Sequence, residues 1–297
     1  HYVDKKTGNH KFVPARVVAL AASAGETARI LLNSKNGKFP DGVANSSGEV
    51  GRNLVDTVGS GISAQIPALE NRPRYNEDGA MGLHMYIPFW LYPEQLKVEL
   101  DYPSGYQYEI GRRFSAPGIG VGGVTGAVDG YGQQLKEDAK RYYGSFLYFT
   151  QRGEMIPNKS CYAEIDPEVR DDYGIPVLKF HYQHSEHEIR QVAHFQETTL
   201  GLIDRLGGKV RGEVKPPEEA ILPGGWIIHE VGTARMGDDA ATSVVNEFGQ
   251  AWDVRNLFVM DGAMFASKAH KNPTLSILTL AWRNSDYLVE CMQRGEL

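Results

Sequence analysis

Residues 16–22 read RVVALAA and are followed at once by SAGETARILL at residues 23–32. The first run is apolar without alternation, which predicts a strand buried on both faces, as in a parallel sheet. The second run carries alanine and leucine at helical spacing, and Ser23 and Glu26 have the spacing of a capping box. A strand followed directly by a helix is part of a βαβ unit. We therefore expect residues 16–22 to belong to a larger parallel sheet.

A second apolar strand is predicted near the other end of the chain. Residues 256–262 read NLFVMDG, which predicts a buried strand that ends in a tight turn. Residues 273–292 then predict a closing helix. We expect its inward face to carry Leu275, Leu278, Ala281 and Leu288. Pieces of one sheet therefore lie at both ends of the chain.

The middle of the chain has a different character. Residues 85–90 and 142–149 are aromatic runs among scattered proline and glycine residues. This pattern favours an antiparallel sheet, one side of which lines a cavity. Helical spacing predicts a long helix over residues 186–206, opened by a capping box of Ser185 and Glu188. The predicted fold class is therefore α/β joined to α+β.

This contrast predicts that the chain is divided into three segments. We predict that the first and last segments share one domain and that the middle segment is a separate domain inserted between them. The expected ranges are residues 1–60, 61–215 and 216–297. A polar stretch with three prolines, residues 209–223, predicts a linker at the second boundary.

The composition is that of an ordinary globular protein and excludes several classes. The 297 residues carry a formal net charge of −6, whereas a nucleic-acid binder usually has a basic excess. No run approaches the roughly 18 apolar residues of a membrane span. Cys161 and Cys291 are too few for a disulfide framework or a cysteine zinc cage. We therefore expect a small-molecule partner, no nucleic acid and no membrane span in this chain.

The last third of the chain carries the strongest chemical signal. Residues 226–237 read WIIHEVGTARMG and place His229 before a Gly-Thr turn, while residues 259–263 read VMDGA and residues 270–275 read HKNPTL. Each motif alone is ordinary, because a single histidine is more often structural than catalytic and Asn-Pro is a common helix start. Their order and spacing together favour a shared active site.

These blocks resemble the C-terminal signature of the glucose-methanol-choline (GMC) family of FAD-dependent oxidoreductases. Residues 16–34 and 48–54 are similar to the middle region of the same family, so the resemblance covers residues 12–57 and 224–290. It implies part of a GMC-type FAD-binding domain together with an antiparallel-sheet substrate domain. The implied activity is oxidation of a hydroxyl group of a sugar or sugar-like alcohol. The blocks look most like those of sugar and sugar-acid dehydrogenases and of pyranose oxidase.

The resemblance also implies roles for single residues. His229 matches the family's active-site histidine, which accepts the hydroxyl proton while hydride passes to the flavin N5. Asn272 matches the partner of that histidine, which is His in some members and Asn in others. The implied cofactor is FAD, and the positions that match the family's FAD contacts are Asp261, Gly262, Ala263, Pro273 and Thr274.

The chemistry of alcohol oxidation is consistent with these residue types. The hydroxyl proton needs an acceptor that titrates near neutral pH, as histidine does. The hydride needs an electron sink, which no side chain provides. The amide of Asn272 can donate a hydrogen bond to the oxygen as its negative charge grows. Asn272 and Pro273 also predict a helix start, whose positive dipole end favours a reduced, anionic flavin.

Two further motifs are expected to have no cofactor or metal role. Residues 118–123 read GIGVGG and satisfy the pattern G-x-G-x-x-G, but no buried strand precedes them and no helix follows, so a glycine-rich bend is expected. His181, His184 and His187 straddle a predicted strand and a predicted helix and share no face. No complete set of metal ligands is present, so a polar pocket rim or a solvated surface is expected instead.

The residues that contact the substrate are less determined. His84, Tyr86, Trp90 and Tyr148 bring aromatic and polar groups to the central sheet, a mixture that suits sugars, although each aromatic taken singly is more often a core residue. We select His84 and Tyr86 as candidate substrate contacts. His270 is a third candidate, for which contact with substrate or flavin and a structural role both stay open.

Part of the family pattern has no counterpart in this chain. The family's own G-x-G-x-x-G and the acidic residue that holds the adenosine ribose are absent, and the sequence opens at His1 without a methionine. We therefore expect a C-terminal portion, whose partner is the missing N-terminal dinucleotide-binding half of the same enzyme. We expect that the chain alone neither holds FAD tightly nor catalyses.

The resemblance leaves the electron acceptor and the location open. A small subunit or a cytochrome is a candidate acceptor, and oxygen or a quinone is another. Similar sugar dehydrogenases are often exported, which makes the periplasm the expected location, although the sequence does not resolve it. A non-catalytic flavoprotein-like binding or scaffold subunit is the alternative function, against which the intact pair of His229 and Asn272 argues. A carbohydrate-binding module is a third, against which the two buried strands argue.

Overall fold

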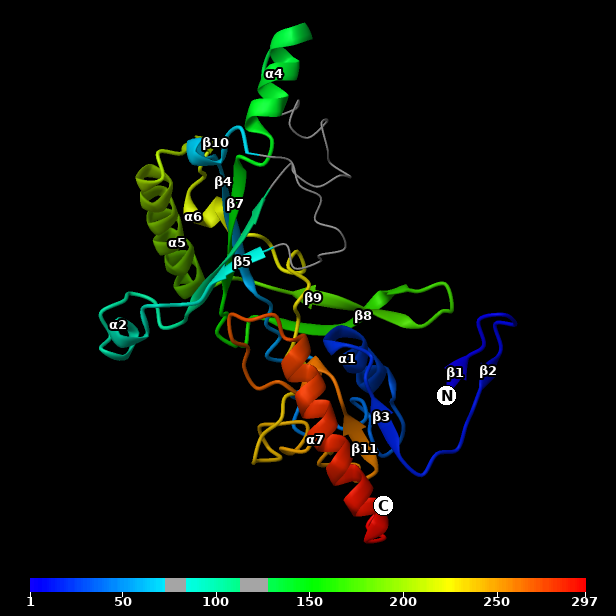
Figure 1. The fold of residues 1–297 in the computed structure, drawn as a ribbon. Coiled ribbons are helices and arrows are strands. Elements are labelled where there is room, and N and C mark those ends of the chain that lie inside the picture. Colours follow the sequence, from blue (N-terminus) through cyan, green and yellow to red (C-terminus); the bar gives the residue numbers. More distant parts are fainter. Residues whose placement is uncertain (73–83, 113–127) are drawn as a thin grey trace. The chain divides into compact units, whose positions relative to one another are not determined.

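A computed structural model describes residues 1–72, 84–112 and 128–297 (Figure 1). These residues form two compact units. The first unit consists of His1–Thr57, Met155–Gln183 and Ile227–Leu297, and the second of Val58–Glu154 and His184–Trp226. The observed boundaries differ from the expected 1–60, 61–215 and 216–297, because residues 155–183 group with the two terminal segments. That these units bind FAD and substrate stays a prediction.

The first unit contains a pair of parallel strands from the two ends of the chain. β3 (Val18–Leu20) pairs with β11 (Leu257–Val259), with Val18 opposite Leu257. All of β11 is buried, whereas Val18 is 43% exposed. The prediction that residues 16–22 are buried on both faces is therefore wrong for this chain, because β3 is an edge of a two-stranded sheet.

α1 (Ala24–Asn33) follows β3 as predicted, but its expected capping box is absent. Ser23 has a φ of 81° and its side chain makes no capping bond. The Ser23 amide instead donates to Asp261 Oδ2 at 3.1 Å, and Thr27 Oγ1 donates to the same oxygen at 2.6 Å. A carboxylate from the other end of the chain therefore holds the start of this helix.

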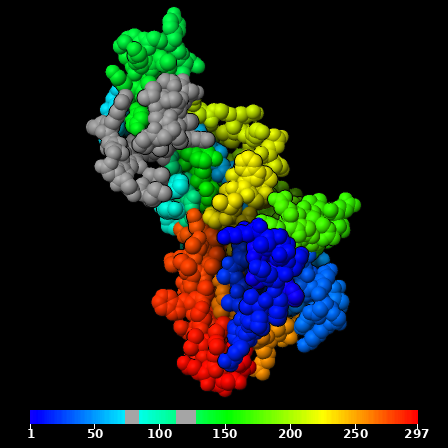
Figure 2. Space-filling model, turned by 90° about the vertical axis from the view of Figure 1, so that its right-hand side faces the viewer, coloured from blue at the N-terminus to red at the C-terminus, as the bar shows by residue number. Residues whose placement is uncertain are grey.

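α7 (Thr274–Gln293) is the predicted closing helix, but it packs through a different face. Leu275 is 75% exposed and Leu278 is 62% exposed, so the prediction that they face inward is wrong. The residues that this helix buries are Asn284 and Cys291. The space-filling view shows α7, in red, beside the blue amino-terminal segment (Figure 2).

The first unit is completed by short elements. Its remaining strands form two antiparallel hairpins, and a single 3₁₀ turn precedes α7. These elements are β1 (Tyr2–Val3), β2 (His10–Lys11), β8 (Tyr162–Arg170), β9 (Pro176–His181) and η2 (Gly262–Met264).

The second unit is built on the predicted antiparallel sheet. Its five strands have the order β10-β4-β7-β6-β5, and every neighbouring pair is antiparallel. The strands are β4 (Val58–Gln65), β5 (His84–Ile87), β6 (Tyr106–Arg112), β7 (Phe146–Gly153) and β10 (Lys209–Arg211). Because β10 lies within residues 209–223, the expected linker supplies an edge strand of this sheet.

The helices of the second unit include the one predicted near residue 186. They are η1 (Pro67–Leu69), α2 (Tyr92–Leu96), α4 (Gly132–Tyr142), α5 (Glu186–Arg205) and α6 (Pro217–Ala220). The capping box that opens α5 is confirmed, since Glu188 accepts the Ser185 amide at 2.7 Å and Ser185 Oγ accepts the His187 amide at 3.3 Å.

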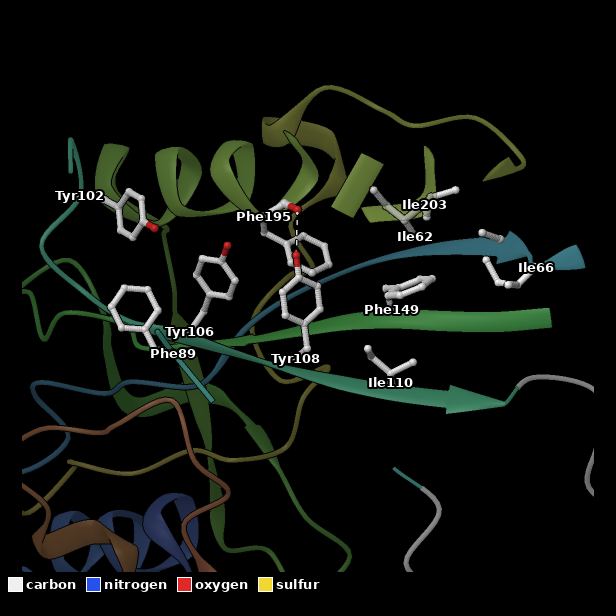
Figure 3. Packing of buried hydrophobic residues seen from close by; sticks show 11 residues of the cluster. Ile62, Ile66, Phe89, Tyr102, Tyr106, Tyr108, Ile110, Phe149, Phe195 and Ile203 are labelled. Carbon is white, nitrogen blue, oxygen red and sulfur yellow. Dashed lines mark hydrogen bonds between the residues drawn. The ribbon is translucent and has the colours of Figure 1, made fainter. Parts of the chain in front are cut away.

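α5 covers one face of the sheet and closes an aromatic core (Figure 3). Phe195 from this helix is fully buried and lies 5.1 Å, ring to ring, from Tyr108 of β6. Phe149 of β7 is 1% exposed in the same cluster. The face of the sheet under α5 is therefore largely a packed core, and Ile62 of β4 and Gln196 of α5 also line a cavity together with Val210 of β10.

Residues 118–123, for which a glycine-rich bend is expected, lie outside the described residues. Within the described ranges, no helix is both long enough and apolar enough to cross a membrane.

Candidate active site

The segment that carries His229 pairs antiparallel with the residues that directly precede β4. Val55 and Val231 exchange backbone hydrogen bonds of 3.1 and 2.9 Å. In an antiparallel pair, residues two positions to either side of such a bridge also face each other, which puts Thr57 opposite His229. Thr57 Oγ1 accordingly lies 3.2 Å from His229 Nδ1. The half-buried imidazole is thus anchored through one ring nitrogen.

A second pairing brings the predicted FAD-binding turn to the same segment. The Gly232 amide donates to the Gly262 carbonyl at 3.0 Å, and the Ala234 amide donates to the Ala263 carbonyl at 2.7 Å. Gly232 has a φ of +97°, and a Cβ at this position would lie 2.3 Å from the Asn53 carbonyl oxygen. Only glycine fits here, because its missing side chain lets the two backbones approach.

Two buried charges surround Thr57. Asp56 is 1% exposed, and its Oδ1 accepts the His229 amide at 3.0 Å and the Thr57 amide at 2.6 Å. Lys268 is 2% exposed and donates its ammonium to Thr57 Oγ1. Burial raises the pKa of the neighbouring Glu230 carboxyl; the Asp56 charge adds to this and the Lys268 charge opposes it. A buried ammonium near a buried carboxylate offsets part of the desolvation cost of both groups.

His270, a candidate substrate contact, is also buried. It is 7% exposed, and burial lowers the pKa of its imidazole to about 4, with further lowering by the charges of Lys271 and Lys268. The ring is therefore neutral at pH 7. Its contact with a substrate stays a prediction.

The residue before His229 has a strained backbone. Ile228 has a φ of +58°, which is an outlier for a β-branched residue, and its side chain is 75% exposed. Such a conformation costs on the order of 1–3 kcal/mol and persists where the surrounding structure imposes it. The bridge at Val231 and the bond from the His229 amide to Asp56 impose it here.

The Asp261 carboxylate shapes the turn at η2. Besides the Ser23 amide and Thr27, it accepts the Ala263 amide at 2.8 Å, so its oxygens are occupied by donors of the chain itself. A Cβ on Gly262 would lie 3.0 Å from Val231 Cγ1, so this neighbour would have to shift by a few tenths of an ångström to admit it. Asp261, Gly262 and Ala263 therefore form a tight, buried turn, and their contact with FAD stays a prediction.

Asn272, Pro273 and Thr274 lie at the start of α7, as predicted. Pro273 has helical dihedral angles, φ −81° and ψ −12°, and its carbonyl accepts the Ile277 amide at 2.9 Å. Asn272 and Thr274 are exposed. The first backbone N–H groups of a helix have no partner within the helix, so this start fits an anionic edge such as that of a reduced flavin. The residues of this chain fit one side of FAD, and their contacts with it stay a prediction.

The other candidate residues lie on the second unit. His84 and Tyr86 are exposed on β5, with ring centroids 6.2 Å apart. Trp90 follows this strand and stacks on Tyr108 at 6.0 Å and 19°, while Tyr148 lies on β7. Their assignment to a substrate stays a prediction.

The three histidines of residues 181–187 lie on different elements. His181 ends β9 and bonds through Nε2 to Glu164 Oε1 at 2.9 Å. His184 lies before α5 and bonds through Nε2 to the Leu222 carbonyl at 3.0 Å, while His187 is exposed on α5. Among the described residues, no group of three His, Cys, Asp or Glu residues is arranged to hold a metal ion.

The sequence interpretation did not single out Asp56, Thr57 or Lys268. Thr57 is 172 residues from His229 and 211 residues from Lys268, so no local motif joins them. The available signal was indirect, because Asp56 and Thr57 lie at the end of residues 12–57, which the family resemblance covers.

Comparison with known proteins identifies the family of the C-terminal part. Residues 157–281 match the family model of GMC oxidoreductases. The 2-methyl-1,2-propanediol dehydrogenase of Mycolicibacterium austroafricanum is 30% identical over 97% of this chain and 50% of its own length. The fructose dehydrogenase large subunit of Gluconobacter japonicus is 26% identical over 99% of this chain and 51% of its own. The predicted family relationship is confirmed.

Solved structures share the fold. A formate oxidase from Aspergillus oryzae RIB40 superimposes with a TM-score of 0.59 at 13% identity, over 91% of this chain and 53% of that chain. Pyridoxine 4-oxidase from Mesorbium loti gives a TM-score of 0.56 at 16% identity, over 91% and 51%. The chain spans about half the length of the curated relatives it matches.

Proposed function

We propose, on the premise that residues 157–281 form a GMC oxidoreductase C-terminal domain, that this chain carries the proton-accepting half of an FAD-dependent alcohol oxidoreductase. In this function His229 takes the proton of a substrate hydroxyl group. The cofactor, when bound, supplies the electron sink for the hydride. Asn272 donates a hydrogen bond to the substrate oxygen.

The anchoring of His229 is the observation that carries this proposal. Its amide is bonded to buried Asp56 and its Nδ1 to Thr57, so the ring is held in one orientation with Nε2 directed away from these contacts. A general base must be held in place before it can take a proton efficiently. The pairing of Gly232 with Gly262 supports the same conclusion, because it joins the His229 segment to the turn expected at the flavin.

The substrate class follows from the relatives and remains our proposal. The relatives' names give 2-methyl-1,2-propanediol, fructose and gluconate as their substrates. All three carry adjacent hydroxyl groups, so we propose a polyol, sugar or sugar acid. Anaerobic flavin reduction with each of these compounds, and with a simple primary alcohol as the control, ranks them.

The decisive variant is His229→Ala in the FAD-loaded enzyme that contains this chain. Loss of the proton acceptor should slow flavin reduction by the substrate roughly 10²–10⁴-fold, as measured by stopped-flow absorbance. His187→Ala, on the exposed side of α5, is the control and should leave the rate unchanged. Near-normal reduction in His229→Ala would instead support a non-catalytic binding or scaffold subunit.

We further propose that the site needs a second polypeptide part to hold FAD. The two-stranded parallel sheet is uncovered at β3, and α7 exposes Leu275 and Trp282, each 75%. Parallel sheets are stable when more strands and covering layers bury them. The test is the flavin absorbance of the purified 297-residue chain, since one tightly held flavin per chain would refute this part of the proposal.

A further inference from the structure

A cavity of about 300 Å³ lies beside β4 in the second unit. Its walls come from β4, β10, α5 and α6, which contribute Gly61, Val210, Gln196 and Glu219, respectively. A volume of this size is at the lower end of the range of small-molecule sites.

The cavity exists because β10 leaves part of the β4 edge uncovered. β10 pairs with β4 only as far as Arg211, which lies opposite Ser63. Gly212 then has a φ of +78°, a left-handed conformation that glycine adopts readily, and the strand ends there. The chain returns to β4 where the Leu222 amide donates to the Gly59 carbonyl at 2.8 Å. One edge residue therefore lies between two covered positions.

That residue is Gly61, and its backbone groups point toward the uncovered edge. In an antiparallel strand, the N–H and C=O groups of alternate residues point to the same side. Gly59 bonds to Leu222 on the outer side, whereas the Ile66 amide, directly after β4, donates to Ser145 on the β7 side at 2.8 Å. Gly61 therefore faces outward, and no outward hydrogen bond of its amide or carbonyl is found within the described residues. The edge offers one donor next to one acceptor.

Gln196 of α5 adds an acceptor to the wall of the cavity. The residue is 8% exposed, and its Nε2 donates to the Lys215 carbonyl at 2.9 Å. This bond uses the amino end of the side-chain amide and leaves the oxygen as the other end. In the described part of the chain, no hydrogen bond to Gln196 Oε1 is found. Gln196 Oε1 therefore keeps its capacity to accept a bond from a ligand.

The charges around the cavity favour a neutral ligand. Arg211 and Lys215 line it together with Glu213 and Glu219, so that two cations are balanced by two anions. A charged ligand would be attracted by one pair and repelled by the other. A peptide strand binds through several consecutive edge groups, whereas only Gly61 is uncovered here. A hydroxyl group both donates and accepts, so adjacent hydroxyl groups match the amide, the carbonyl and the charged rim together.

We infer that this cavity is a binding site for a neutral polyhydroxy compound, a sugar or a polyol. Adjacent hydroxyl groups of the ligand bond to the Gly61 amide, to the Gly61 carbonyl and to Gln196 Oε1. The site does not depend on the proposed function, because it shares no residue with the candidate catalytic, flavin-binding or substrate positions. Binding there requires no FAD.

The test is the binding of D-glucose to the full 297-residue chain, followed at the Gly61 amide. Backbone ¹H–¹⁵N spectra of the deuterated chain with glycine-selective labelling report this signal, which is assigned by its loss in Gly61→Ala. We expect a saturable shift with glucose and with glycerol. Cyclohexanol, which has one hydroxyl group on an apolar ring, should shift the signal little. The absence of a saturable shift with glucose overturns the inference.

Matched variants locate the binding. Val210→Phe fills the cavity from β10 with a larger strand-forming residue and should abolish glucose binding. Val169→Phe on β8 of the first unit is the control, because Val169 is 52% exposed on a strand and does not line the cavity. Gln196→Met removes the acceptor from a second wall and should weaken binding several-fold. Native binding in Val210→Phe and Gln196→Met overturns the site.

Further probes test the ligand class and its independence from the proposed catalytic site. Gluconate and glucosamine carry an anionic and a cationic group, respectively, and both should bind more weakly than glucose. Tighter binding of either compound, or of an acetylated dipeptide amide, overturns the assignment to neutral polyhydroxy compounds. His229→Ala should leave the glucose response unchanged whatever its effect on flavin reduction. Loss of the response in His229→Ala would assign it to the proposed catalytic site and overturn the inference.

Discussion

The two units differ in how completely each covers its sheet. In the second unit, five antiparallel strands lie next to one another and α5 closes one face, so that Tyr108 is 1% exposed and Phe195 is fully buried. In the first unit, β3 and β11 pair across nearly the whole length of the chain, yet Val18 of β3 is 43% exposed. The difference follows from the number of strands, since β4, β7 and β6 each have a neighbour on both sides whereas β3 has a neighbour on one side only.

This difference shows which unit buries its own core and which leaves apolar surface exposed. The second unit buries its aromatic core with its own helix. The first unit carries His229, Asp261 and the start of α7, but leaves β3 and the Trp282 side of α7 uncovered. The residues with predicted catalytic and flavin-binding roles therefore lie on the more open of the two units, and each prediction below compares a site in one unit with a site in the other.

Removing one aromatic ring from each unit should give the largest difference between the units in the free energy of unfolding. Phe195→Ala in the second unit removes a fully buried ring and should lower the free energy of unfolding by about 3–5 kcal/mol. Trp282→Ala on α7 removes a ring that is 75% exposed and should change it by no more than about 0.5 kcal/mol. Urea denaturation measures both. A large loss for Trp282→Ala would show that α7 is covered in solution.

Acid should destabilise the first unit through His270. Its folded pKa of about 4 is below the ordinary 6.5, so between these values the unfolded chain binds a proton that the folded chain does not. The contribution of neutral His270 to the free energy of unfolding is therefore fully present above pH 6.5. It is lost as the pH falls toward 4, and the loss is at most about 3 kcal/mol.

Thermal melting between pH 7 and pH 4 tests this prediction. His270→Gln should flatten the dependence of Tm on pH. His187→Gln, at an exposed site of the second unit, should keep the native slope. Equal slopes for the native chain and His270→Gln would assign the acid sensitivity to other groups.

Two glycines should respond to alanine with opposite signs. Gly232→Ala places a Cβ 2.3 Å from the Asn53 carbonyl oxygen at a φ of +97°, and should cost about 2 kcal/mol. Gly201→Ala in α5 meets nothing within 4 Å and should stabilise the chain by about 0.5–1 kcal/mol. The shift in Tm measures the effect of both substitutions. An unchanged Tm for Gly232→Ala would show that the segment carrying His229 can move to accommodate the new Cβ.

The smallest expected effect compares two serines that precede helices. Ser185→Ala removes the capping bond of α5 and should cost about 1 kcal/mol. Ser23→Ala should change stability by less than about 0.5 kcal/mol, because the Ser23 side chain caps nothing and its amide is kept. Equal losses at the two positions would contradict the caps seen in the structure.

The same two serines show how far local patterns reach. Both are followed three residues later by glutamate, and both therefore predict a capping box. The box forms at Ser185, where Glu188 accepts the Ser185 amide and Ser185 Oγ accepts the His187 amide. It does not form at Ser23, because Asp261 returns 238 residues later and accepts the amide. A motif read from one segment cannot include a partner that another segment brings.

The sequence by itself determined the local elements of this protein and the choice of candidate site residues. The strand and helix at residues 18–33, the closing helix from Thr274, the antiparallel middle sheet and the family-like blocks around His229 all depend on patterns within a few residues. Periodicity, capping and turn chemistry act over that range, so a linear reading finds them.

Only the tertiary structure decided what surrounds these residues. It placed Thr57 opposite His229, Lys268 beside Thr57, and Leu275 and Leu278 on an exposed face. Strand register, burial and the hydrogen-bond partners of each side chain depend on which distant segments meet. Side-chain spacing within one helix cannot reveal which face another segment covers, and a single residue does not indicate which hydroxyl will lie opposite it.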